Sequence, residues 1–415
     1  MELSYQNADA RVSGVGGTSA KHFVAFIDSL VRRQYSISYV CLLAKHVLAF
    51  GRWCEHRGVS LRGLTDDHIE IYQRHRCKRR SRCSETQRRE RRALQLLLSF
   101  LREQALCPAV VTPLTAVDKV IEDFARFLQA DHGLAEATVE NYTRITRQFL
   151  YWRFGNVKPR LRELRATDSI EFLRNEAKRL APPALKNTVS ALRAFLRYAQ
   201  FCGEVSAALA CGVPAVAGWV RTPPVPKAIA AEHAQRAIAG CNRHSAVGRR
   251  DRAVLLLLAR LGLRACEIIR LTLDDIDWER AQLRVRSKGG SEALLPLPAD
   301  VGETIAAYLT RGRPTSADRH LFLRSAAPIR GFKEGGDAIG TIVRDALKRA
   351  KVNAPHRGSH QFRHALAVQM LQRGASLLEI GQVLRHRSPQ STSIYAKVDL
   401  VALRRLAMPW PGGAR

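Results

Sequence analysis

The stretch SHQFRHALAVQMLQRGASLLEIGQVLRHRSPQSTSIYAKV, residues 359–398, decides the fold of the last part of this chain. Ser359 is a favourable N-cap, because its hydroxyl can accept from the free amides of a first helical turn. A buried face for the following turns is predicted by apolar residues at helical spacing: Ala365, Leu366, Val368, Met370 and Leu371. Such a helix would carry His360 and Arg363 one turn apart on a neighbouring face.

Both ends of this stretch carry side chains suited to phosphate chemistry. A guanidinium such as that of Arg363 forks onto two phosphate oxygens, and an imidazole such as that of His360 exchanges a proton near neutral pH. His386 comes later, and Tyr395 follows it after the turn residues Ser388 and Pro389. The His-x-x-Arg spacing alone would suit a capped core helix before a surface loop. Joined to the later histidine and tyrosine, it favours a phosphoryl-transfer site.

The start of the stretch resembles the second motif of the tyrosine recombinase (phage integrase) family, His-x-x-Arg-His, here His360 to His364. The third motif of that family is Leu-Gly-His with a tyrosine nine residues later. It is similar to Leu384 to His386 with Tyr395. Arg385 stands where the family usually has glycine, so the turn at this point departs from the family pattern.

Two upstream segments extend the resemblance. LGLRACEIIRLTLDDIDW, residues 261–278, resembles the first motif of the family and makes Arg264 its first arginine and Glu267 the supporting acidic neighbour. LRVRSKGGSEALLPLP, residues 283–298, alternates around a Lys-Gly-Gly turn, as a β-hairpin does. Lys288 stands where the family keeps its hairpin lysine.

The resemblance, which is specific over about residues 226–405, implies a catalytic set of six residues: Arg264, Lys288, His360, Arg363, His386 and Tyr395. Tyr395 would be the nucleophile that forms a covalent 3′-phosphotyrosine, which splits one transesterification into two steps. His360 would be the base for the attacking phenol, and Lys288 the acid for the departing 5′ oxygen.

Within the same resemblance, Arg264 and Arg363 would stabilise the charge that grows on the phosphate oxygens, and His386 would hydrogen-bond the phosphate. The sequence has no Gly-x-x-x-x-Gly-Lys-Ser/Thr loop and no carboxylate cluster for Mg²⁺. Its nine cysteines form no CxxC pair, which favours reduced thiols. No common zinc site has the spacing of His68, His75, Cys77 and Cys83. We therefore expect no cofactor and no metal.

The charge of the chain indicates a polyanionic partner. Among 415 residues, 67 Lys and Arg stand against 37 Asp and Glu, a formal net charge of +30. Hydrophobic residues make up 46% of the chain, enough to build cores, which argues against a disordered basic tail. The first residues lack an apolar signal region, and the longest apolar run, Ala253 to Ala259, cannot span a bilayer. We expect a cytoplasmic, nucleoid-associated protein without a membrane partner.

The length of the chain predicts two or three domains. SALRAFLRYAQ at 190–200 echoes ALQLLLSFLRE at 93–103, and the apolar stripes before them follow the same order, which predicts a repeat of two four-helix units. Convergent amphipathic helices stay an alternative because the identities are few. The predicted regions are a flexible N-terminus (1–18), a helical arm (19–108), a helical core-binding domain (114–205), a linker (206–226), a catalytic domain (227–407) and a tail (408–415).

In the resembling family a helical core-binding domain precedes the catalytic domain, and both clamp the duplex. Residues 114–205 take that place here, and residues 19–108 would be an added arm. Basic side chains of both units are DNA-binding candidates because each can neutralise a phosphate: Arg88, Arg89, Arg91, Arg92, Arg144, Arg147, Lys186 and Arg193.

The catalytic region is predicted to be an α+β domain, mainly helical, with a small β-sheet. Helices are expected at 228–241, 248–263, 299–311 and 337–351, and strands at 282–286, 293–297 and 321–323.

The resemblance implies a site-specific recombinase that integrates, excises or transposes a mobile element on double-stranded DNA sites. A homotetramer on two sites is expected, and sister recombinases stay open as further partners. Apolar residues beyond Tyr395 and the tryptophan Trp410 favour docking of the tail onto a neighbouring subunit, with folding back onto its own domain as the alternative. A type IB topoisomerase and a non-catalytic DNA-binding accessory protein are the two alternatives for function.

Overall fold

The computed structural model describes residues 19–79, 84–108, 115–214, 228–287, 291–354, 358–398 and 403. The predicted N-terminus 1–18, the tail 408–415 and Lys288 lie outside these residues, as does most of the predicted linker. In the described part, no helix has the length and apolar character needed to cross a membrane.

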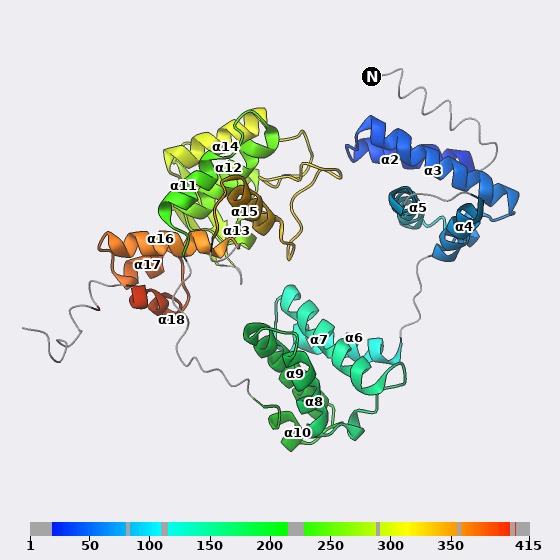
Figure 1. Ribbon diagram of the computed structural model, residues 1–415, viewed down its shortest axis with the longest axis horizontal. Coiled ribbons are helices and arrows are strands. Elements are labelled where there is room, and N and C mark those ends of the chain that lie inside the picture. Colours follow the sequence, from blue (N-terminus) through cyan, green and yellow to red (C-terminus); the bar gives the residue numbers. More distant parts are fainter. Residues whose placement is uncertain are drawn as a thin grey trace, which may run out of the picture. The chain divides into compact units, whose positions relative to one another are not determined.

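Clusters of buried apolar residues mark a first helical body (19–108), a second helical body (115–214) and a C-terminal body (228–398), which holds a main cluster and a small one around Tyr395 (Figure 1). Residues 111–223 also separate from the rest of the chain as a compact unit. The predicted fold class, helical units before a mainly helical domain with a small sheet, is confirmed. The domain boundaries themselves stay predictions.

The first helical body folds because each helix buries one apolar stripe. In its first helix Phe23, Phe26, Ile27 and Leu30 recur at helical spacing and are almost fully buried. They pack with stripes of the later helices into one core. The elements are α2 (Ser19–Arg32), α3 (Ile37–His56), the 3₁₀ helix η1 (Leu61–Gly63), α4 (Asp66–Arg79) and α5 (Ser84–Glu103).

The second helical body begins at a well-formed cap. Thr115 accepts from the Asp118 amide at 3.1 Å, and Asp118 accepts from the Thr115 amide at 3.2 Å. The elements are α6 (Ala116–Ala130), α7 (Glu136–Phe154), η2 (Leu161–Glu163), α8 (Ala166–Ala177), α9 (Pro182–Phe201) and α10 (Ala207–Cys211). Leu209 and Val213, inside the predicted linker, are buried in this core, so the body extends past α9.

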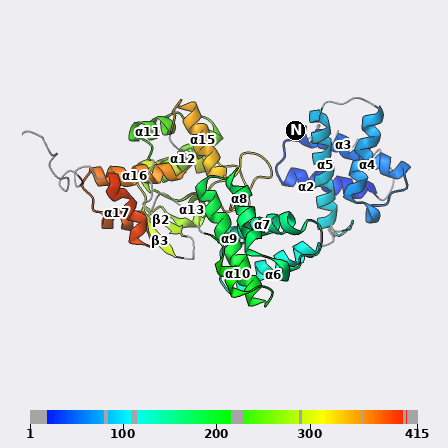
Figure 2. The same ribbon diagram turned by 60° about the horizontal axis from the view of Figure 1, so that its bottom comes forward.

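The two helical bodies, both visible as bundles in Figure 2, repeat one order of elements: two helices, a 3₁₀ helix and two further helices. η1 and η2 begin at Leu61 and Leu161, and the next helices at Asp66 and Ala166. An aromatic trio also recurs. In the first body the Phe50 ring stacks on Trp53 with centroids 5.9 Å apart and meets the Tyr72 ring edge-on at 5.1 Å. In the second body Phe149 stacks on Trp152 at 6.3 Å and meets Phe172 edge-on at 5.3 Å. Tyr72 therefore corresponds to Phe172, since both are buried in their own cores, whereas the neighbouring Ile71 is exposed.

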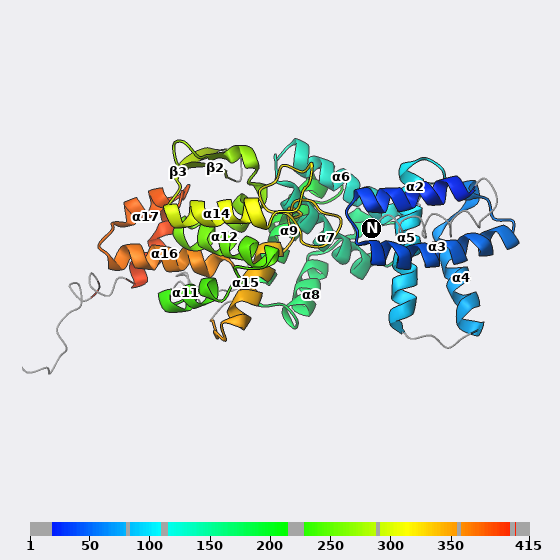
Figure 3. The ribbon, with the colours of Figure 1, turned by 90° about the horizontal axis from the view of Figure 1, so that it is seen from above.

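The C-terminal body layers its helices around α12, whose residues Ala253 to Leu258 are buried. Figure 3 shows β2 and β3 on one side of α12 and α14, with α11 and α15 on the other. Its elements are α11 (Ala231–Ala239), α12 (Ala246–Arg260), α13 (Ala265–Arg270), η3 (Leu273–Asp275), β1 (Ile276–Asp277), β2 (Gln282–Arg286), β3 (Glu292–Pro296), α14 (Ala299–Arg311), α15 (Ala338–Arg349), α16 (His360–Gln372), α17 (Leu377–Val383), α18 (Pro389–Ser393) and η4 (Ile394–Val398).

The sheet is antiparallel in the order β1-β2-β3. β2 pairs with β3 through Arg284 opposite Leu294, and the inward residues Leu283 and Val285 are fully buried. The hairpin is predicted from this alternation of inward and outward residues along β2. The inward residues Leu283 and Val285 belong to the main core of the C-terminal body and so attach the sheet to it.

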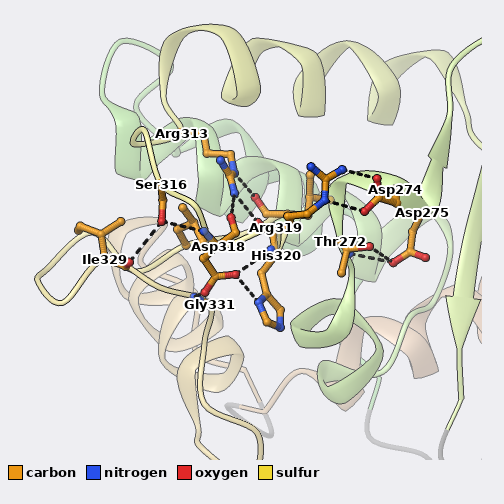
Figure 4. Close-up of polar contacts among 12 residues, drawn as sticks. Thr272, Asp274, Asp275, Arg313, Ser316, Asp318, Arg319, His320, Ile329 and Gly331 are labelled. Carbon is orange, nitrogen blue, oxygen red and sulfur yellow. Dashed lines mark hydrogen bonds and ion pairs between the residues drawn. The ribbon is translucent and has the colours of Figure 1, made fainter. Parts of the chain in front are cut away.

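The predicted strand at 321–323 does not form; isolated bridges at His320 and Leu323 take its place. The loop is held instead by Asp318, which accepts from the His320 and Gly331 amides at 2.9 and 2.7 Å (Figure 4). Burial alone would raise the pKa of Asp318, but these hydrogen bonds and the His320 ring lower it to about 2. A side chain at residue 331 would meet the His320 ring at 2.6 Å, so glycine is required there.

The helix predicted from Ser359 is α16, but the predicted cap is absent. Ser359 itself has helical backbone angles, φ −62° and ψ −27°, and its side chain makes no capping hydrogen bond. A serine can cap only from an extended conformation, so the turn before α16 rules this contact out.

Candidate active site

The candidate site joins three parts of the C-terminal body: the start of α13, the first turns of α16, and the segment from the end of α17 to η4. Arg264 precedes α13, Arg363 and His364 lie in α16, and the turn after α17 leads to Tyr395 in η4. Hydrogen bonds and charge interactions across these parts bring Arg264, Arg363, His386 and Tyr395 into one region. Their catalytic roles stay predictions.

Glu267 is buried and links Arg264 to the turn after α17. Its Oε2 accepts from the Arg264 amide at 2.9 Å and from the Arg385 guanidinium at 3.0 Å. Its Oε1 accepts from the Arg264 guanidinium at 2.7 Å and from the Ser287 hydroxyl at 3.2 Å. Burial alone would raise the pKa of Glu267, but the Arg264 amide and the charges of Arg385 and Arg264 lower it. The ionised carboxylate therefore holds the Arg264 side chain in place.

Arg363 is 2% exposed and donates to the backbone carbonyls of Gly262 and Leu384. Burial and the charges of Arg264 and Arg385 lower its pKa to about 10, so the guanidinium is still cationic at neutral pH. Gly262 has a φ of 58°, and a Cβ there would meet the Leu384 side chain at 2.8 Å. Glycine at 262 thus permits the close approach that Arg363 bridges.

Tyr395 is 1% exposed, and its hydroxyl lies 2.9 Å from Nδ1 of His364. Burial raises the pKa of the phenol, and the charge of Arg363 offsets only part of this. A phenol with a raised pKa needs a base before it can attack. His364 is within reach of its proton.

The structure therefore places His364, and not His360, beside the phenol. The His360 ring stacks on His364 with centroids 5.9 Å apart and stays open to solvent. Protein atoms around the ring still remove part of its hydration. This partial burial and the charges of Arg363 and Arg264 lower the pKa of His360. The role of His360 as the base at Tyr395 stays a prediction, and the contact of the phenol with His364 makes His364 the alternative for that role.

His386 is oriented by Thr392, whose hydroxyl lies 2.7 Å from Nδ1. Its ring is parallel to that of Tyr395, with centroids 6.4 Å apart. Burial and the nearby charges of Arg363 and Arg264 lower the pKa of His386 to about 4. The imidazole is therefore neutral at pH 7, and Nε2 is the nitrogen left to meet a phosphate.

Sequence reasoning missed the site roles of four residues. His364 stands inside the quoted motif without a role assigned from it, and Arg385 stands out in the sequence only as a departure from glycine. Ser287 and Thr392 carry no signal in the sequence, because their partners come from distant elements. Lys288, the predicted acid, lies outside the described residues.

The DNA-binding candidates differ in their surroundings. Arg88, Arg89, Arg91 and Arg92 are exposed along α5, where Arg89 pairs with Glu85. Lys186 and Arg144 are exposed as well, whereas two others serve their own body. Arg147 pairs with Asp118 at 3.2 Å, and Arg193 donates to the Val213 carbonyl at 2.9 Å. Contact with DNA stays a prediction for all eight.

Among the residues that the structure describes, no group of three or more His, Cys, Asp or Glu side chains could hold a metal ion.

Sequence comparison finds two family models in the chain. Residues 227–400 match the phage integrase family, and residues 121–200 match the phage integrase N-terminal SAM-like domain. The chain is also 41% identical to the putative integrase/recombinase y4rA of Sinorhizobium fredii, a match that covers 99% of both chains.

Comparison with solved structures supports the same fold. The post-cleavage complex of the XerH site-specific recombinase with its palindromic difH substrate covers 82% of this chain and 94% of that one, with a TM-score of 0.55 and 17% identity. The Tn1549 transposon integrase in complex with transposon right end DNA covers 70% of this chain and 99% of that one, with a TM-score of 0.51 and 18% identity.

Proposed function

The chain belongs to the phage integrase family of tyrosine recombinases and is a site-specific DNA recombinase, and we propose that Tyr395 is the residue through which it cuts and rejoins DNA. One observation carries the proposal. A buried phenol within hydrogen-bond distance of an imidazole lies in the field of Arg363, whose guanidinium stays cationic.

The first step is a transesterification. The Tyr395 oxygen bonds to phosphorus, its proton passes to His364, and the bond from phosphorus to the 5′ oxygen breaks. The departing 5′ oxygen takes a proton from Lys288, whose role follows from the family motif. The 3′-phosphotyrosine keeps the bond energy, so the 5′ hydroxyl of another strand can reverse the step and release the tyrosine.

Arg264 and Arg363 bind the nonbridging phosphate oxygens, where negative charge grows in the transition state. Both are held before DNA arrives, by Glu267 and by the carbonyls of Gly262 and Leu384. His386 adds a neutral hydrogen bond to the phosphate. This prior arrangement lowers the reorganisation needed during the reaction.

Double-stranded recombination sites are the proposed DNA partners, and nucleoid association would follow from binding them. The second helical body is proposed to act with the C-terminal body as the clamp on the duplex. The α5 arginines of the first helical body are proposed to neutralise further phosphates, because they lie exposed along one helix. Integration, excision or transposition of a mobile element is the proposed biological role.

The salt dependence of DNA affinity tests whether the first helical body binds phosphates. Replacing both Arg88 and Arg92 by glutamine should flatten the slope of log affinity against log salt by roughly 0.9 for each phosphate that is no longer neutralised. Filter binding of the full chain at several salt concentrations measures this slope. Deletion of residues 19–106 should flatten it further. An unchanged slope in both proteins would make this body a protein-interaction arm.

A homotetramer on two sites is proposed as the working assembly, with the segment after η4 docking onto a neighbouring subunit. The site is first located by footprinting fragments of the gene's own genomic neighbourhood, and two copies are placed on one plasmid. The full chain should exchange strands between the copies. A chain ending at Lys397 should still bind one site but lose exchange. Relaxation of a single-site plasmid without exchange would indicate a topoisomerase, and normal exchange by the shortened chain would exclude docking in trans.

A further inference from the structure

Arg385 adopts a backbone conformation that arginine rarely takes. Its φ is 55°, in the left-handed region where glycine, which has no Cβ, is the favoured residue. Its Nε is buried and has no hydrogen-bond partner, although a buried donor without an acceptor is costly. Two unfavourable features at one residue indicate that its side chain makes a compensating interaction elsewhere.

That interaction is with the buried carboxylate of Glu267. Nη2 of Arg385 lies 3.0 Å from Oε2 of Glu267, and the two side chains are 11% and 0% exposed. Nη1 also donates to the Val383 carbonyl at 3.2 Å, which closes the turn on itself. The guanidinium therefore occupies one carboxylate oxygen and leaves the other to Arg264.

Arg264 and Arg363, the two arginines proposed to bind the phosphate, also donate hydrogen bonds to the backbone of this turn. The carbonyl of Arg385 accepts from Nη2 of Arg264 at 3.3 Å, and the carbonyl of Leu384 accepts from Nη2 of Arg363. His386 follows directly, and its amide donates to the Gly381 carbonyl at 2.9 Å. A single turn thus touches Arg264, Arg363 and the histidine that meets the phosphate.

We propose that Arg385 is a positioning residue of this active site: its guanidinium shares Glu267 with Arg264, and its left-handed turn presents the carbonyl that orients Arg264 beside His386. The inference rests on the proposed function of the site. Without Arg385, the carboxylate would have only Arg264 as a charged partner and would draw that guanidinium away from the phosphate. The net positive charge at the site would also fall by one.

Arg385→Gly tests this sharply because glycine relieves the backbone strain and removes only the side chain. If Arg385 is merely tolerated at this turn, Arg385→Gly should cleave at the wild-type rate or faster. If Arg385 positions the site, single-turnover cleavage by Arg385→Gly should be slower by about 10- to 100-fold, with an unchanged Kd for the uncleaved site. Lys351→Gly is the matched control, since Lys351 is exposed, has a φ of 51° and follows α15, which holds none of these site residues.

Two further variants identify the partner through which Arg385 acts. In a Glu267→Gln background, Arg385→Gly should cost at most a few-fold, because the carboxylate that it serves is gone. Arg385→Lys should recover part of the rate, since it keeps the charge but loses the fork. Thermal melts of every variant report folding, so each rate refers to folded protein.

Cleavage by Arg385→Gly at the wild-type rate would overturn the inference, and so would an equal loss in the Glu267→Gln background. Both results require adduct formation by the wild-type chain and none by Tyr395→Phe. Failure of that pair of controls would instead overturn the proposed function, and this inference with it. The two failures are therefore distinguishable on one nicked DNA substrate.

Discussion

Tyr395→Phe is expected to abolish covalent attachment to DNA while leaving the Kd for the site nearly unchanged. The hydroxyl supplies the attacking oxygen, whereas the ring fills a buried position that phenylalanine also fills. Loss of the hydrogen bond to His364 should cost about 1 kcal/mol of folding stability. A suicide substrate nicked beside the cleavage point traps the adduct, which a denaturing gel then resolves.

Tyr308→Phe provides the matched control for this experiment. Tyr308 is also 1% exposed in the C-terminal body, and its hydroxyl accepts from the Leu323 amide at 3.2 Å, away from the site. It should form the adduct at the wild-type rate. A covalent band from Tyr395→Phe, or its loss in Tyr308→Phe, would contradict the assignment.

Arg363→Lys is expected to slow single-turnover cleavage by about 10²- to 10³-fold, the effect of losing one preorganised donor to a developing oxyanion. The charge is kept, but one ammonium group cannot hold the carbonyls of Gly262 and Leu384 and also reach a phosphate. The pKa of Arg363 near 10 means that the wild-type guanidinium stays charged below about pH 9, so this loss should not depend on pH between 6 and 8.

Arg250→Lys separates this effect from a general loss of stability. Arg250 is 8% exposed in the same body and donates to Asp251 and to the Leu323 carbonyl, outside the site. It should lower the melting temperature without changing the cleavage rate of folded protein. If the cleavage rate of Arg363→Lys lies within about threefold of the wild-type rate, the proposed role of Arg363 in stabilising the phosphate charge is wrong.

The parts of the fold that follow local periodicity could be predicted from the sequence. Alternating residues gave β2 at Gln282–Arg286 with its boundaries, and a helical stripe gave α14 at Ala299–Arg311. Short elements fared worse, because the two-residue strand β1 and the single-residue bridges at His320 and Leu323 are too short to show an alternating pattern. The polar network of Asp318 replaced the strand expected there.

The sequence predicts a set of residues for the candidate site, but it could not predict the contacts among them. Spacing places His360 and His364 one turn apart in α16, yet only the packing of η4 against that helix determines which imidazole meets Tyr395. Likewise, an arginine in a glycine position indicates an unusual turn. That its guanidinium reaches Glu267 depends on the position of α13, because Glu267 lies 118 residues earlier in the sequence.

The most direct measurement is the identity of the residue that carries DNA in the trapped adduct. Trypsin should release the peptide SPQSTSIYAK, residues 388–397, after the DNA is digested to a short nucleotide. Fragmentation in a mass spectrometer then locates the modified residue, since the peptide also contains serine and threonine hydroxyls. We predict a 3′-phosphate linkage on Tyr395. A nucleotide on any other residue would contradict the account.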